Sequence, residues 1–123
     1  MPENDPSPFL PLREPTFFIL LSLFHDEKHG YAIMKDVEQI SRGSLRLSTG
    51  TLYEALARLL EQGLIERVDS LKETGPGKPR KLYRLTHLGR RVIEAESQRL
   101  TMLAFAARQH MGEQWTPDQP ASI

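Results

Sequence analysis

Hydroxyl, small and cationic side chains gather at the start of one predicted helix, in the stretch LSTGTLYEALARLLEQGLIER (residues 47–67). Thr51 and Tyr53 carry hydroxyl groups, and the open first-turn N–H groups of Thr49 and Gly50 can donate hydrogen bonds to a phosphate. Small side chains on the outer face would let this helix approach another surface closely. The alternative is an ordinary amphipathic helix whose outer face meets water. On a helical wheel the core-facing stripe consists of Leu52, Ala55, Leu56 and Leu59.

Basic charge is concentrated in the middle of the chain. The 123 residues include 16 Lys and Arg and 16 Asp and Glu, so the net charge is zero. That charge is segregated, with a net of −4 over residues 1–41, +6 over 42–91 and −2 over 92–123. The run KPRKLYRLTHLGRR (residues 78–91) has six basic residues and no acidic one. This middle segment is where a polyanion would bind, and the alternative is a solvated strand and helix start.

The elements that position these groups follow from hydrophobic spacing and turn residues. Residues 1–15 contain five prolines, so an extended tail that packs locally at best is expected there. Ser48 is the expected N-cap of the helix that follows it, and Gly63 its C′ residue. The other expected elements are a buried helix from Thr16, a polar turn at 25–30, a helix over 31–41, a short strand at 45–47, strands at 64–71 and 81–85 around the hairpin tip ETGPGKPR, and a helix from Thr86 to about Met111.

This order of elements is that of a winged helix-turn-helix followed by an added C-terminal helix. The expected fold class is therefore mainly α with a small β-hairpin. The expected divisions are a proline-rich tail (1–15), a winged helix-turn-helix DNA-binding domain (16–85), a dimerisation helix (86–111) and a flexible tail (112–123). A recognition helix of this kind inserts its N-terminal end into the major groove of double-stranded DNA.

Several function classes are disfavoured by what the sequence lacks. It has no cysteine, which removes disulfides and thiolate metal sites and fits a cytoplasmic location. His25, Asp26, Glu27 and His29 do not have H-E-x-x-H spacing, so a structural turn is expected there, with no metal and no cofactor. No nucleophile elbow or phosphate-cradling loop is present, so no enzyme is expected. The longest nearly apolar run, residues 17–24, is far shorter than the roughly 20 residues of a membrane span.

Three fragments, HGYAIMKDVE (29–38), residues 47–67 and KLYRLTHLG (81–89), resemble the PadR family of bacterial transcriptional regulators. The family patterns HGY-x-I, GTLY-x-x-L-x-RL-x-x-x-GLI and Y-R-L-T-x-x-G occur in the same order, and the likeness covers about residues 16–111. The resemblance implies a homodimer with a winged-helix fold that usually represses transcription. Thr49 and Glu54 stand where proline is frequent in the family, a difference that concerns base preference rather than the fold.

The resemblance also implies which residues contact DNA. The start of the third helix would enter the groove, and the basic hairpin would reach the flanking backbone or minor groove. Glu54 either accepts a hydrogen bond from a cytosine amino group or complements the helix dipole. The expected DNA-binding residues are Ser48, Thr49, Gly50, Thr51, Tyr53, Arg58, Lys78, Arg80 and Lys81.

The C-terminal helix is too long and too apolar for one small domain. It would span 26 residues, or about 39 Å. Its apolar residues form two stripes over about half of the circumference, so one stripe is expected to serve its own core and the other a partner's. The alternative is a helix folded back under the proline-rich N-terminus. The expected dimerisation residues are Leu88, Val92, Ala95, Leu100, Met102, Leu103, Ala106 and Ala107.

Some members of the PadR family, which this sequence resembles, bind flat aromatic compounds between their subunits. The resemblance therefore makes a small aromatic effector a further candidate partner. Phe105 and Trp115 would line its pocket; the alternative is that Phe105 packs on the partner's N-terminal segment and Trp115 is loosely held. The sequence therefore predicts a homodimeric transcriptional regulator, a repressor in most of this family, that binds a palindromic operator. The competing hypothesis is a dimeric winged-helix module that binds a protein or small molecule without DNA.

Overall fold

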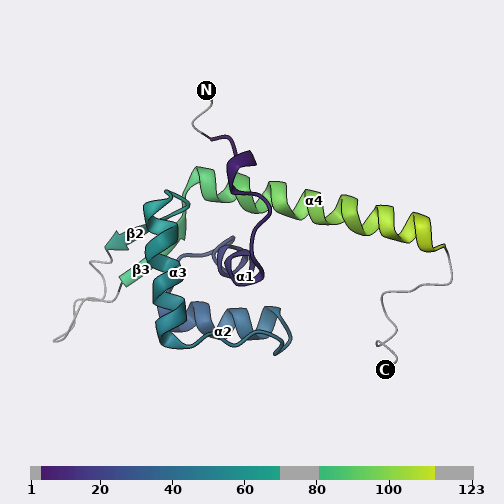
Figure 1. Cartoon of the computed structure of the whole chain (residues 1–123). Coiled ribbons are helices and arrows are strands. Elements are labelled where there is room, and N and C mark those ends of the chain that lie inside the picture. Colours follow the sequence, from purple (N-terminus) through teal and green to yellow (C-terminus); the bar gives the residue numbers. More distant parts are fainter. Residues whose placement is uncertain (1–3, 70–80, 113–123) are drawn as a thin grey trace.

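The computed structural model describes residues 4–69 and 81–112, in which helices predominate and three short strands form one sheet (Figure 1). The strands are antiparallel in the order β1-β3-β2, so β2 and β3 are the two arms of the predicted hairpin. The mainly helical winged-helix architecture is thereby confirmed. In chain order the elements are η1 (Ser7–Phe9), α1 (Glu14–Ser22), β1 (Lys28–His29), α2 (Gly30–Ile40), α3 (Thr49–Glu61), β2 (Ile65–Asp69), β3 (Lys81–Leu85) and α4 (His87–Met111).

The hydrophobic core lies between α1, α2, α3 and the first half of α4. Figure 1 shows α1 in the middle of the domain, with α2 on one side and α4 on the other. Because α1 is apolar on all sides, this central place buries surface that would otherwise contact water. Pro15 in its first turn costs little, since that position has no intrahelical hydrogen bond to lose. The largest fully buried side chains include Ile19, Leu20, Ile33, Leu52, Leu56, Leu59, Leu64, Ile65 and Ile93.

The predicted caps of α3 and α4 are confirmed. The Ser48 hydroxyl accepts the Thr51 N–H at 3.1 Å, and the Thr86 hydroxyl accepts the Gly89 N–H at 3.0 Å. Gly63 adopts a φ of +75°, and the N–H of Leu64 bonds back to the Leu59 carbonyl at 3.0 Å, which ends α3 in a Schellman motif. The Thr86 hydroxyl also donates to the Gly63 carbonyl at 2.6 Å, so the end of α3 is bonded to the start of α4.

The prediction of a strand at residues 45–47 was wrong. The Ser41 hydroxyl accepts the Leu45 N–H at 3.1 Å and donates to the Leu45 carbonyl, so these backbone groups bond locally instead of joining the sheet. The third strand is β1, within the segment predicted to be only a polar turn. It pairs His29 with Leu82 and Lys28 with Tyr83.

The N-terminal segment packs more extensively than predicted. Phe9, Leu10 and Leu12 lie against the hydrophobic core, and the backbone N–H of Leu12 donates to the Glu96 carboxylate on α4 at 2.9 Å. The segment therefore crosses α4 rather than packing only on its own neighbours (Figure 1). Among the described residues, no helix is both long and apolar enough to cross a membrane.

Candidate nucleic-acid interface

The first turn of α3 is an open hydrogen-bonding surface. Ser48, Thr49, Gly50 and Thr51 are all exposed, and a Cβ added at Gly50 would meet no atom within 4 Å. The Ser48 hydroxyl donates to the Thr51 hydroxyl at 2.9 Å, which leaves the Thr51 proton directed elsewhere. Helix geometry gives the N–H groups of Thr49 and Gly50 no intrahelical acceptor, so they can donate to an anion. This turn can therefore contact a phosphate through both backbone and side chains.

The inner face of α3 matches the prediction from the helical wheel. Leu52, Ala55, Leu56 and Leu59 are buried, whereas Tyr53 remains 45% exposed. The helix is thus fixed to the core along one side, and its N-terminal turn and outer face are free to meet a partner.

Tyr53 and Lys81 lie 28 positions apart in the sequence but line the same surface hollow, of about 400 Å³, with His29, Gly30 and Tyr31. Pairing of β1 with β3 brings them together, because it places the start of β3 beside the start of α2. His29 Nδ1 lies 3.2 Å from the Lys81 carbonyl oxygen. The lining of the hollow thus includes a tyrosine and a lysine, residue types whose hydroxyl and ammonium groups bind phosphate.

Tyr83, on β3 two residues after Lys81, is a buried tyrosine close enough to Tyr53 to interact with it electrostatically. It is 3% exposed, and burial raises the pKa of its phenol, with a smaller contribution from neighbouring Tyr53. Tyr83 is therefore neutral at any physiological pH and does not oppose the approach of an anion.

Arg58 lies apart from this hollow. It lines a separate depression of about 430 Å³ with Arg13, Gln62 and the N-terminal segment around Phe9. Of the three cations predicted for the wing, Lys81 is exposed at the start of β3, and Lys78 and Arg80 lie outside the described residues. The structure therefore brings Lys81 to Tyr53 and places Arg58 on the other flank of α3.

Comparison with known proteins identifies the group to which this arrangement belongs. Residues 19–95 match the model of the transcriptional regulator PadR-like family, which is more than half of the chain. The chain belongs to the PadR-like family. Members of this family are transcriptional regulators rather than enzymes, as the sequence predicted. Within the described ranges, no group of three or more His, Asp or Glu residues is arranged to hold a metal ion.

The PadR-like chain resembles two curated proteins over part of their length. It is 33% identical over 85 residues to the Escherichia coli transcriptional regulator YqjI, which covers 69% of this chain and 38% of that protein. It is 37% identical over 86 residues to an uncharacterised 37.1 kDa protein of a Streptomyces fradiae transposon, covering 70% of this chain and 23% of that protein. The chain thus spans well under half the length of these relatives.

Solved PadR-family structures share the fold. A regulator from Clostridium difficile superposes with a TM-score of 0.65 at 30% identity, covering 79% of this chain and 97% of that one. A PadR-like regulator from Bacillus cereus gives 0.66 at 25% identity, with coverage of 80% and 93%. Bacillus subtilis PadR, solved in complex with operator DNA, gives 0.60 at 20% identity, with coverage of 82% and 63%. The last of these shows likeness of fold alone.

Sequence reasoning missed two residues that the PadR-like fold places at this surface. Gly30, the first residue of α2, lies directly under the ring of Tyr53, and Tyr31 beside it is 68% exposed. Both belong to the fragment HGYAIMKDVE, where a glycine followed by an aromatic residue at the start of a helix was the available signal.

In α4, the burial of a side chain depends on its position along the helix more than on the side of the helix that it occupies. Val92 and Ile93 are buried in the core of their own chain, so the prediction of Val92 as a dimerisation residue was wrong. Leu88 and Ala95 are partly buried in the same half. Beyond Arg99 every described residue of the helix is exposed, including Leu100, Met102, Leu103, Ala106 and Ala107 of the predicted set.

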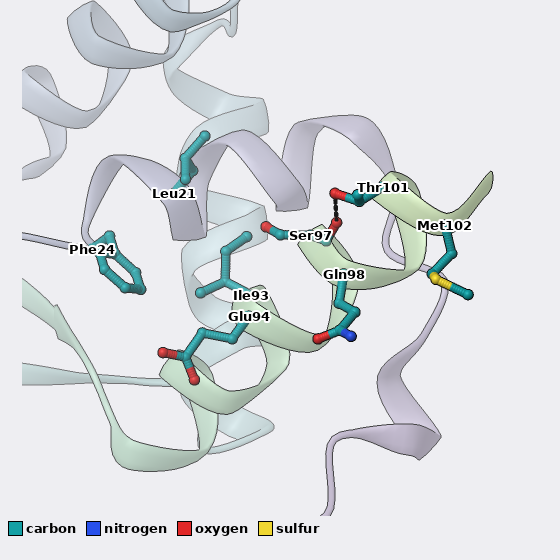
Figure 2. A pocket seen from close by; sticks show the side chains of 8 residues that line it. All are labelled: Leu21, Phe24, Ile93, Glu94, Ser97, Gln98, Thr101 and Met102. Carbon is teal, nitrogen blue, oxygen red and sulfur yellow. Dashed lines mark hydrogen bonds between the residues drawn. The ribbon is translucent and has the colours of Figure 1, made fainter. Parts of the chain in front are cut away.

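A groove of about 470 Å³ runs between α1 and α4 beside this exposed half (Figure 2). Leu21 and Phe24 line one wall, and Ile93, with Met102 farther along the helix, lines the other. Between Ile93 and Met102, α4 presents polar side chains to the groove. The Thr101 hydroxyl donates to the Ser97 carbonyl at 2.9 Å. The polar lining residues of the groove are Glu94, Ser97, Gln98 and Thr101.

Proposed function

We propose that this PadR-like chain is a DNA-binding transcriptional regulator that acts as a homodimer and represses transcription from a palindromic operator. The observation that carries the proposal is the open first turn of α3 beside the hollow shared by Tyr53 and Lys81. This surface supplies hydrogen-bond donors for the DNA backbone phosphates on either side of α3, which can enter the major groove. Bacillus subtilis PadR, a protein of the same fold, was solved in complex with operator DNA, which supports DNA binding by this chain.

In this proposal each part of the winged helix has its own role. The N-terminal turn of α3 reads base edges, and Lys81 with Lys78 and Arg80 binds the flanking backbone or minor groove. Arg58 would contact a phosphate on the opposite flank. Because each neutralised phosphate releases counterions, the affinity for DNA should fall steeply as salt is raised.

The second copy would pack on the exposed half of α4. The buried positions Gly89, Ile93 and Glu96 continue at spacings of four and three residues through Leu100, Leu103 and Ala107, so the core-facing side of α4 runs on past the end of its own domain. Met102 lies both in this exposed half and in the α1–α4 groove. A partner's α4 would therefore cover the groove and the stripe as one continuous surface, and hold two recognition helices about 34 Å apart, one turn of DNA.

The most detailed part of the proposal is a small aromatic effector whose binding releases the DNA. Its support is the exposed ring of Phe105 on α4, next to the surface on which the second copy would pack. Binding there would change the angle between the two DNA-binding domains. The single tryptophan, Trp115, lies outside the described residues and provides a fluorescence probe for titration with planar aromatic acids. Unchanged Trp115 fluorescence and unchanged DNA affinity at saturating compound would reject this part.

The test is a mobility shift on the DNA upstream of the protein's own gene. Wild type should shift it with an affinity that falls as salt is raised, and Tyr53→Ala and Arg80→Ala should bind more weakly. A folded, dimeric wild type that shifts neither this DNA nor a pool of random duplexes would favour the alternative, a dimeric module for a protein or small molecule.

A further inference from the structure

Tyr53 rests on a glycine that the backbone does not require. A Cβ built at Gly30 would lie 2.9 Å from Tyr53 Cζ, 3.4 Å from its Cε1 and closer still to its hydroxyl oxygen. The described glycines with positive φ are Gly43, Gly63 and Gly112, so Gly30 has a φ that any residue adopts. The contact with Tyr53, rather than the backbone, therefore explains why Gly30 has no side chain.

The position of the Tyr53 ring determines what its hydroxyl can reach. The phenol end of the ring lies against the first residue of α2, in the hollow that Lys81 lines from β3. A ring turned toward solvent would carry the hydroxyl out of this hollow and away from the lining that Lys81 shares. Gly30 is buried, whereas nearly half of the Tyr53 side chain is exposed, so the ring is the partner that can move.

We infer that Gly30 is a positioning residue for DNA binding, because only a glycine lets Tyr53 lie where its hydroxyl and Lys81 bind the same backbone phosphate. This inference rests on the proposed function and adds a residue that does not itself contact DNA. Gly30→Ala would push the ring outward without disturbing the core, and alanine would favour α2. Folding stability should therefore be kept while DNA affinity falls about tenfold, the effect of losing one hydrogen bond to a charged group.

A double-mutant cycle measured by mobility shift tests this inference. Gly30→Ala and Tyr53→Ala should each weaken binding about tenfold, and the double variant should bind no more weakly than Tyr53→Ala, because the added methyl then meets empty space. Thermal unfolding should show all three folded. A further loss of affinity in the double variant would overturn the inference, since Gly30 would then act independently of Tyr53.

Tyr53→Phe provides a second test that does not require Gly30→Ala to fold. It keeps the ring over Gly30 and removes only the hydroxyl, so it should lose about as much affinity as Tyr53→Ala. Full DNA affinity in Tyr53→Phe, or in a folded Gly30→Ala, would overturn the inference. The proposed function would remain intact in that case, because the wild type would still bind DNA. A wild type that does not bind DNA overturns both.

Discussion

The buried carboxylate of Glu96 accepts the backbone N–H of Leu12 at 2.9 Å, so the N-terminal segment is bonded to α4 across 84 positions of sequence. Arg99, one turn farther along α4, donates to the same carboxylate through two of its nitrogens. Glu96 is 1% exposed, and its charge is compensated by this guanidinium and by the Leu12 N–H. The Glu96 carboxylate thus adds a polar link between the N-terminal segment, which also packs on the core, and the helix proposed to carry the dimer.

Protonation of Glu96 should loosen this attachment at acid pH. The hydrogen bonds from Arg99, and then that from Leu12, hold the pKa of Glu96 below its ordinary value of 4.5 despite burial. Because the folded-state pKa is depressed, its contribution to stability is fully present above pH 4.5 and is lost as pH falls through the folded-state value.

Glu96→Gln should therefore lower the free energy of unfolding at pH 7 by about 1–3 kcal/mol, the cost of a lost hydrogen bond to a charged group. It should also flatten the acid limb of the stability curve. Urea titrations from pH 7 to pH 3 measure both effects, with Glu61→Gln, at an exposed position on α3, as the matched control. Parallel pH curves for wild type and Glu96→Gln would contradict the assignment.

A charge on the exposed half of α4 should separate the subunits without unfolding them. Leu103 is 54% exposed within one chain, so Leu103→Glu costs the monomer little, whereas in the proposed dimer it would bury an unpaired carboxylate. Sedimentation velocity should show a folded monomer, and the affinity for the operator should collapse because one winged helix makes half of the contacts.

The control for this variant is Gln39→Glu, at an exposed position on α2, on the opposite side of α1 from α4. It adds the same charge and should leave the dimer intact. Dissociation by both variants would indicate repulsion of charge rather than loss of a specific contact. A dimeric Leu103→Glu protein would place the subunit interface elsewhere.

The local features of this fold were predictable from the sequence because each is encoded within a few residues. Ser48, Gly63 and Thr86 end or begin helices through contacts with residues at most five positions away. The core face of α3 followed from its leucine spacing alone. Long-range pairings were not accessible in this way. Nothing near His29 in the sequence indicates that it pairs with Leu82, and the hollow between Tyr53 and Lys81 depends on that pairing.

The sequence identified the apolar residues of α4, but it did not separate those that pack in the core of their own chain from those left exposed for a partner. A helical wheel sorts residues by angle and discards their position along the axis, so Val92 and Met102 were both included in the predicted dimerisation set. The domain covers only the first half of the helix, which buries Val92 and leaves Met102 62% exposed. The size of the domain determines where along a helix the core ends. The periodicity of the sequence carries no information about that size.

Removing the charge of Lys81 should weaken binding to all duplex sequences alike. A phosphate contact carries no base information, so Lys81→Gln should lower operator and nonspecific affinity by a similar factor. It should also reduce the slope of log affinity against log salt by about 1. Arg84→Gln is the matched control on the same strand, because the Arg84 guanidinium already pairs with Glu66 at 2.7 Å. A loss confined to the operator would instead make Lys81 a base contact.

Two helical glycines should respond oppositely to alanine. A Cβ at Gly89 would overlap the carbonyl oxygen of Leu64 and lie 3.0 Å from its carbonyl carbon, whereas one at Gly50 would meet nothing within 4 Å. The obstacle at Gly89 is backbone that is itself bonded to the N–H of Thr86, so it cannot rotate aside as a side chain would. Gly89→Ala should therefore cost about 1–3 kcal/mol or more, as overpacking of a core does. Gly50→Ala should gain up to about 1 kcal/mol from helix propensity. Urea denaturation of the two variants beside wild type measures the difference, and equal midpoints would mean that α4 can move away from Leu64 without cost.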